Sequence, residues 1–549
     1  LEVGGQGSGG GDGGDVTISL DAGGTIVTSG EGSIGLFAQS VGGGGGKAGD
    51  VEKALSAKWA DLNLGVGAGV QKNAGKGGDG GKITVSIDAA ITTTGAEAHG
   101  IVLQSIGGSG GMAGIDGELG DNAAARNFAG SVGDSGDGGI IKATVSNQVI
   151  VSGESAIGLF AQSTSGGADD DTSGTVTIDV TDGGTIEANG VDGRGILAQS
   201  ESKDGANAKI AITIDAGAKV SVGKDGDEAI ALLDGNDNTI TNSGTLTHEG
   251  GPDAGGHVVR TNGTAALTIT NTGRLEGALR SELDDGVSGT AKAITVNNEA
   301  GGMYGLGWES DLAGGTITNA GSMTAGQFGE ASQVGVHGSI NQTQDGSTQV
   351  DIVFGDENDL IDLSDPNASS TFAGTVNPFA VSGTPRDNEK GFLRIIEATG
   401  SLDTTDLTAV SSATIDYTVV RSTETEDGET FQIASLGYNV DYTPWNGDAV
   451  AQSKVSDSAR SLINANHDRV GNNVDDLIAA LPGEASTQSV ASRISNAHEA
   501  AASTSVDPDF VQDLVLLLLR TETVDELVDT YDRFAPAEIF APSGSARFA

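Results

Sequence analysis

The chain has 549 residues, with 76 acidic against 28 basic side chains, a net charge of −48 and no cysteine. Nucleic-acid binding requires Lys and Arg to replace phosphate counterions, so this charge excludes nucleic acid as a partner and disfavours anionic membrane surfaces. Glycine contributes 89 residues without a G-X-Y period, which excludes collagen and is typical of tight turns between short strands.

One short phrase recurs along the first half of the chain. SIGLFAQS begins at Ser33, AHGIVLQS at Ala98, AIGLFAQS at Ala156 and GRGILAQS at Gly193, and a degenerate copy, AIALLDGN, begins at Ala229. Self-similarity of this kind indicates a stacked array, in which no single repeat can bury its own apolar face. The shortest interval suggests a unit of about 36 residues, to which the longer intervals add Gly-rich inserts.

Each unit contains three short strand-like segments. In the first copy, the GDGG phrase at 11–14 precedes an alternating segment at 16–20, and two further segments follow at 25–28 and 34–38. GDGG recurs at 78–81 and 136–139, each time before a strand. The pattern predicts an all-β solenoid over residues 1–345, a right-handed parallel β-helix. Val16, Ile18, Ile34 and Leu36 are expected to point inward.

The four glutamines of the repeated phrase occupy the same position in every unit. Rungs of 18–22 residues would place two rungs in each unit and about 16 rungs in the array. Gln39, Gln104, Gln162 and Gln199 would then lie about 9–10 Å apart, too far for a continuous amide ladder. We therefore expect each glutamine to bond locally to the backbone.

The unit becomes degenerate after Gly235 and the chain changes character near Gln349. Asn242, Asn271 and Asn319 each open an Asn-x-Gly phrase, predicted as a corner because Asn tolerates and Gly adopts the left-handed conformation. Longer, aromatic-rich strands predict a β cap over 346–450 that closes the solenoid. Helical spacing then predicts a short α-helical tail in 451–549, with one helix starting at Asp507.

Three regions resemble the passenger of a large Gram-negative autotransporter, the type V secretion class. They are the Gly-rich AQS-type repeat seen best in GSIGLFAQSVGGGGG from Gly32, the segment 359–379 together with 395–407, and TVDELVDTYDRFAPAEIFA from Thr523. These are similar, in order, to the repeats, the closing segment and the junction before the membrane barrel. The resemblance implies a cell-surface or secreted protein of the Gram-negative outer membrane. Two departures are expected: the barrel is absent from this chain, and further repeats precede Leu1.

The sequence offers few candidates for chemistry. VGDSGDGG at Val132 resembles the nucleophile phrase of chymotrypsin-like proteases, but its GDGG is the third repeat copy, so Ser135 is interpreted as structural. The six histidines, at 99, 248, 257, 337, 467 and 498, show no metal-ligand spacing. No catalytic or cofactor-binding residue is therefore assigned.

Two acidic clusters are candidate Ca²⁺ ligands, the only cofactor considered. The first comprises Asp169, Asp170 and Asp171, and the second comprises Asp356, Glu357 and Asp359. Carboxylate oxygens are the ligands that Ca²⁺ prefers, although neither cluster has the tandem repetition of a calcium-binding array.

Two functions remain open. The first is a non-enzymatic β-helical stalk or adhesin. Its partners would be cell-surface glycans, host or neighbouring-cell proteins, or a second copy of itself, and its contact loops would lie at 42–76 and 107–131. The second is a carbohydrate-active enzyme, a polysaccharide lyase or hydrolase on the same scaffold. A groove with three or more converging carboxylates and a Lys or Arg would favour the enzyme.

Overall fold

The computed structural model describes most of the repeat region and the segment that follows it. The described residues are 10–44, 77–108, 135–166, 171–202, 205–250, 256–283, 289–383, 385, 389–426, 428–441, 516–517, 519–523 and 526. The chain divides into two compact units, one of residues 1–322 with 335–341 and one of 323–334 with 342–549.

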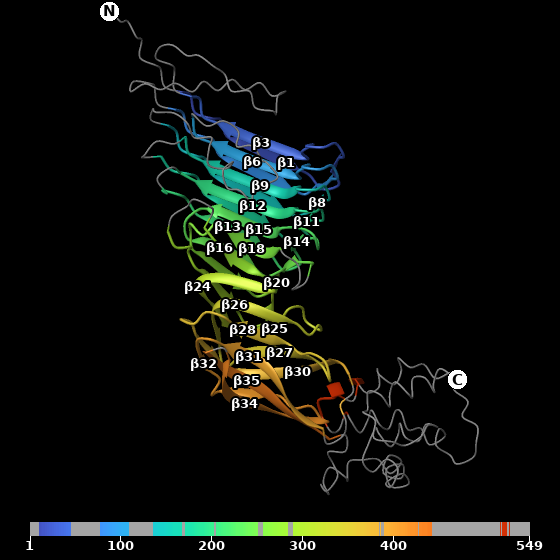
Figure 1. Ribbon diagram of the computed structural model, residues 1–549. Helices are drawn as coiled ribbons and strands as arrows, with labels where there is room; N and C mark the ends of the chain where they lie inside the picture. The colour runs from blue at the N-terminus through green and yellow to red at the C-terminus, as the bar shows by residue number, and fades with distance from the viewer. Residues whose placement is uncertain are drawn as a thin grey trace, which may run out of the picture. The chain divides into compact units, whose positions relative to one another are not determined.

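The first unit is built from three walls of parallel strands (Figure 1). The first wall holds β1 (Val16–Leu20), β4 (Ile83–Ile87), β7 (Ile141–Val145), β10 (Val176–Val180), β13 (Ile210–Ile214), β16 (Asn238–Asn242), β19 (Leu267–Asn271) and β22 (Ile294–Asn298). The second holds β2 (Thr25–Thr28), β5 (Ala90–Thr93), β8 (Gln148–Val151), β11 (Thr185–Ala188), β14 (Lys219–Val222), β17 (Thr245–His248), β20 (Arg274–Gly277) and β23 (Met303–Leu306).

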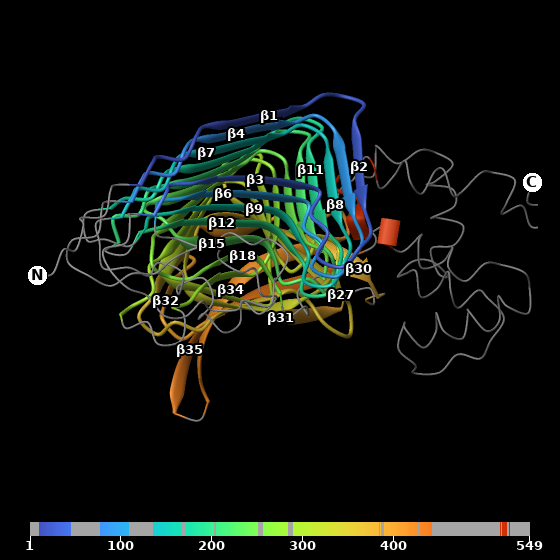
Figure 2. The ribbon, with the colours of Figure 1, turned by 90° about the horizontal axis from the view of Figure 1, so that it is seen from above.

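The third wall completes each turn of the chain. It holds β3 (Leu36–Val41), β6 (Ile101–Ile106), β9 (Ile157–Thr164), β12 (Arg194–Glu201), β15 (Glu228–Asp234), β18 (His257–Thr261) and β21 (Leu279–Ser281). β24 (Glu309–Asn319) begins beside β21 and ends beside β22, so it passes from the third wall to the first. Seen along the stack, the three walls enclose one core (Figure 2). This is the predicted right-handed parallel β-helix, and the fold class is confirmed.

The number of rungs differs from the prediction. One whole unit forms a single three-strand rung. Among the described residues, eight strands and the end of β24 lie in the first wall, which is about half of the expected 16 rungs. The turns use more residues than the strands do, so a 36-residue unit winds once and not twice. In the degenerate fifth copy, the strand register is shifted by two residues from the alignment of the phrases, because the residue that pairs with Gln199 is Leu233.

The core is aliphatic and continuous. β4 shows the pattern, with Ile83, Val85 and Ile87 exposed by 1% or less and the residues between them facing outward. Val16 and Ile18 pair with Ile83 and Val85, so they point inward as predicted. Leu36 pairs with the buried Ile101 and also points inward.

Ile34 does not follow the prediction. It packs against a separate cluster, formed by Val102, Ile157, Phe160, Leu197 and Ala231. The inward direction belongs to the neighbouring Gly35, since a Cβ there would lie 2.6 Å from Ile91 Cγ2. Glycine recurs at this position in the four full copies of the phrase, where the space beside the core is too small for a side chain.

The structure contains a glutamine ladder, although the spacing expected from the sequence excluded one. Nε2 of Gln39 donates to Oε1 of Gln104 over 3.1 Å, Gln104 donates to Gln162 over 3.0 Å, and Gln162 donates to Gln199 over 2.8 Å. The expectation was wrong because one rung per unit places equivalent residues in adjacent strands, about 4.8 Å apart.

The AQS serine and the GDGG phrase form a clamp between rungs. Ser105 Oγ accepts a hydrogen bond from Gly139 N over 2.9 Å and donates to Gly81 O over 2.8 Å. Ser40 makes the equivalent pair of bonds to Gly81 and Gly14. The two phrases therefore recur together because each serine joins the end of one rung to the start of the next.

The Asn-x-Gly corners have a different basis from the one expected. Asn242, Asn271, Asn298 and Asn319 form a buried ladder in which each Nδ2 donates to the next Oδ1 over 2.7 Å. None of these asparagines has a positive φ, nor do the glycines that follow in the Asn-x-Gly phrases. Glycine is needed for space, since a Cβ at Gly273 would lie 2.2 Å from Gly244 O.

The second unit has shorter parallel stacks and an antiparallel end. β26 (Gln333–Gln342) lies mostly in the first unit. The second unit contains most of β25 (Ser322–Ala325), together with β27 (Ser347–Val353), β28 (Leu360–Leu363), β29 (Ser369–Phe372), β30 (Gly374–Ser382), β31 (Lys390–Ala398), β32 (Ser401–Asp403), β33 (Leu407–Ala409), β34 (Ile415–Glu426) and β35 (Glu429–Val440). β27, β30 and β33 stack in parallel, while β35 pairs antiparallel with both β34 and β31.

Only a small part of the predicted helical tail is described. The helical residues 516, 517, 519 and 520 belong to the second unit, where Leu519 is buried and Arg520 Nε donates to Ala380 O over 2.8 Å. The guanidinium of Arg520 also lies 4.3 Å from the ring centre of Phe379. No helix among the described residues has the length and hydropathy that crossing a membrane requires.

Candidate functional site

The predicted calcium ligands of the second unit do not converge. Asp356 and Glu357 lie exposed on the turn after β27, whereas Asp359 is only 2% exposed. Its carboxylate accepts hydrogen bonds from Asp351 N over 2.9 Å, Ser332 N over 2.8 Å and Thr324 Oγ1 over 2.8 Å. Burial raises the pKa of Asp359 to about 8. Asp359 is therefore a structural carboxyl that holds three strand ends together.

The first acidic cluster is only partly described. Asp169 and Asp170 lie outside the described residues. Asp171 is buried and accepts a hydrogen bond from the Ser135 hydroxyl, which is itself fully buried. A buried serine cannot reach a substrate, which agrees with the structural interpretation of Ser135. Within the described ranges, no group of three or more His, Asp or Glu side chains could hold a metal ion.

Two histidines of the first unit have lowered pKa values. His99 Nδ1 accepts a hydrogen bond from Ile157 N over 3.0 Å, and burial lowers the pKa of His99 to about 4. His257 also has its pKa lowered to about 4, mainly by burial. Both rings are therefore neutral at physiological pH.

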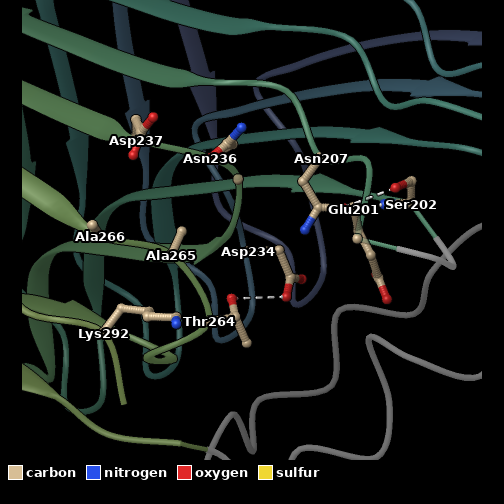
Figure 3. Close-up of a pocket in the computed structure, with 12 residues that line it drawn as sticks. Glu201, Ser202, Asn207, Asp234, Asn236, Asp237, Thr264, Ala265, Ala266 and Lys292 are labelled. Carbon is tan, nitrogen blue, oxygen red and sulfur yellow. Dashed lines mark hydrogen bonds between the residues drawn. The ribbon is translucent and has the colours of Figure 1, made fainter. Parts of the chain in front are cut away.

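A cavity on the first unit was not predicted from the sequence. It lies where four consecutive rungs turn from the third wall to the first, has a volume of about 580 Å³ and appears in Figure 3. The lining consists of Glu201, Ser202, Gly205, Asn207, Asp234, Gly235, Asn236, Asp237, Thr264, Ala265, Ala266 and Lys292. The lining is polar, with three carboxylates, two amides, two hydroxyls and one ammonium group.

The floor of the cavity is held by Asp234. Its Oδ1 accepts a hydrogen bond from Asn262 Nδ2 over 3.1 Å and lies 3.2 Å from the Thr264 hydroxyl. Its Oδ2 lies 3.3 Å from Nε2 of Gln199, which also donates to Glu201 Oε2 over 2.9 Å. The glutamine ladder therefore ends on two carboxylates of the cavity.

The turn above this floor has an unusual backbone. Asp234 and Asp237 have φ values of 60° and 47°, and Gly235 between them has 84°. Asn238 stabilises this turn, since its Nδ2 donates to Asp234 O over 2.8 Å and its Oδ1 accepts from Ile210 N over 3.0 Å. Left-handed residues other than glycine cost energy and persist only where the surroundings hold them.

The cavity has the composition that would favour an enzyme, but one of its three carboxylates is already engaged in hydrogen bonds. Three carboxylates and Lys292 line it. Asp234, however, is surrounded by three donor side chains, which occupy the lone pairs that a nucleophile or base would need. Sequence reasoning missed this site because Lys292 lies 58 residues after Asp234 and belongs to no copy of the recurring phrase.

The fold thus defines a β-helical protein with a polar cavity at one corner. No family model matches the chain, and no curated protein matches it. Among solved structures, the crystal structure of the Haemophilus influenzae Hap adhesin is similar, with 12% identity and a TM-score of 0.27. The match covers 77% of this chain and 48% of that chain, so it spans about half of the adhesin's length. A likeness at this level carries no argument about function.

Proposed function

We propose that the chain is a non-enzymatic autotransporter passenger, cell-surface or secreted, that acts as a β-helical stalk and adhesin. The observation that carries this proposal is that the repeated polar side chains form hydrogen bonds between neighbouring rungs. In consecutive repeats, Gln104 and Ser105 bond to the rungs on either side, and Asp79 accepts a hydrogen bond from Asp137 N over 3.0 Å. A repeat whose polar groups bond along the stack builds a scaffold and not a series of catalytic sites.

The proposed location follows from the sequence resemblance and from charge. A net charge of −48 without cysteine suits a chain that crosses a pore unfolded and folds outside. Its partners would be cell-surface glycans, proteins of a host or neighbouring cell, or another copy of the passenger. The contact loops predicted at 42–76 and 107–131 lie almost wholly outside the described residues. We expect no cofactor for this role.

The adhesion proposal can be tested by surface display. The chain would be fused to an outer-membrane carrier in a non-adherent Gram-negative host, and attachment to cultured cells and to bacteria displaying the same chain would be counted. Attachment above that of the carrier alone is expected. Attachment equal to the carrier in both assays would contradict the proposal.

A second candidate is a carbohydrate-active enzyme, favoured by the three carboxylates and Lys292 that line the cavity. It predicts release of reducing ends or unsaturated products from polysaccharides incubated with the soluble chain. Loss of such turnover in an Asp237→Asn variant would establish the enzyme and displace the adhesin proposal.

A further inference from the structure

The cavity combines size, position and chemistry that suit one class of ligand. A volume of about 580 Å³ lies in the range of about 300–1,000 Å³ that is typical of small-molecule sites. It is formed by side chains from four consecutive turns between the third and the first wall, each held between two paired strands.

The lining contains both donors and acceptors. The Asp237 carboxylate and the Asn236 amide lie exposed on the strained turn, and the Lys292 ammonium group lies across the cavity from them (Figure 3). Hydroxyl groups both donate and accept, so a polyhydroxylated ligand can pair with all three.

Other ligand classes fit less well. A phosphate, sulfate or acidic sugar would meet the carboxylates of Glu201, Asp234 and Asp237. A basic peptide side chain would meet these carboxylates but also the ammonium group of Lys292. An apolar ligand would contact only two apolar side chains in the described lining, those of Ala265 and Ala266.

We propose that this cavity binds a neutral saccharide. The inference rests on the proposed adhesin function and names the site and ligand class through which adhesion occurs. Asp234 and Gln199 are positioning residues, since they fix the floor through mutual contact. Asp237, Asn236 and Lys292 contact the ligand. Among the described residues that line the cavity, none is aromatic and able to stack on a sugar ring, so each site binds weakly and many displayed copies together produce adhesion.

The test uses the soluble full chain and saturation-transfer NMR. The probes are neutral glucose-, galactose- and mannose-terminated tetrasaccharides, a sialylated tetrasaccharide and a tetra-lysine peptide. The variants are Asp237→Asn and Lys292→Ala, and matched controls are Asp215→Asn and Lys224→Ala at exposed turns elsewhere on the unit. All four positions are exposed, so the melting temperature should not change.

At least one neutral tetrasaccharide should bind, and binding should weaken by about fivefold in each cavity variant but in neither control. The inference would be overturned if no neutral probe bound, including the case in which only the sialylated probe or only the peptide binds. It would also be overturned if all variants bound the neutral probe equally. Surface adhesion of the same variants separates the two proposals. Adhesion that survives both cavity substitutions would refute the cavity as the adhesive site and leave the adhesin function intact. Binding of the probe followed by its cleavage would support the cavity as a saccharide site but refute the non-enzymatic adhesin function.

Discussion

Gln104 and Gln162, 58 positions apart in the chain, are joined by a hydrogen bond of 3.0 Å between Nε2 and Oε1. Both side chains are about 1% exposed. A buried amide that loses its partner keeps the cost of desolvation, so each member of the ladder depends on its neighbours.

Replacing Gln104 with Met should therefore destabilise the first unit. The Met side chain has a similar length but leaves Gln39 without its acceptor and Gln162 without its donor. We expect a loss of about 1–3 kcal/mol in the free energy of unfolding, measured with urea. The control is Gln148→Met, because Gln148 is exposed and lies outside the ladder. Equal stability of both variants would show that the ladder contributes nothing.

Replacing Gly158 with Ala tests the close packing of the repeated phrase. The new Cβ would lie 2.5 Å from Ile186 Cγ2 and 2.6 Å from Gly195 O. Because backbone and core must both move, we expect a loss of about 1–3 kcal/mol, seen as a lower melting temperature. Gly14→Ala is the control, since nothing lies within 4 Å of a Cβ there. A Gly158 variant as stable as this control would refute the packing argument.

The stability of the second unit should depend on Asp359. Burial raises the pKa of this carboxyl from 3.8 to about 8, so the folded state holds its proton more tightly than the unfolded state. The stabilisation is complete below about pH 4 and is lost as the pH rises through about 8. An Asp359→Asn variant should lose this slope in urea unfolding at pH 4–9, whereas Asp356→Asn should keep it. An unchanged slope in the Asp359 variant would contradict the assignment.

Histidine produces the opposite trend in the first unit. Burial lowers the pKa of His99 from 6.5 to about 4, so its contribution is present above pH 6.5 and is lost as the pH falls toward 4. His99→Asn keeps an acceptor for Ile157 N but does not titrate. We expect the free energy of unfolding of this variant to depend less steeply on pH between 4 and 6.5. Hydrogen exchange of amides in the first unit measures this dependence. A dependence as steep as the parent's would exclude His99 as its source.

The sequence predicts the class of fold well because the alternation of Val16 and Ile18 and the recurring GDGG and AQS phrases reflect contacts that every rung repeats. The number of residues in a rung is less predictable, because it depends on the length of the turns. The sequence of a glycine-rich turn does not indicate where the turn begins and ends. This one error removed the glutamine ladder from the expected structure.

The candidate site could not be predicted in the same way. Asp234 and Asp237 share one turn and Lys292 comes from another, 58 residues after Asp234, so no period or spacing brings the three together. Asp359 appeared as a calcium ligand because its neighbours are acidic, although its side chain points away from theirs into the protein. Only the direction of each side chain separates a buried structural acid from an exposed one.

The asparagine ladder offers the sharpest test of a buried polar network. Asn271 donates to Asn298 and accepts from Asn242, and its Nδ2 also lies 3.1 Å from Met303 O. Replacing it with Ala breaks the ladder at its centre and leaves buried amides on both sides, so we expect a loss of about 2–4 kcal/mol. Asn297→Ala is the matched control, because Asn297 lies on the same wall but outside the ladder. Urea unfolding of both variants measures the difference, and a loss at Asn271 no larger than at Asn297 would mean that the ladder does not stabilise the corner.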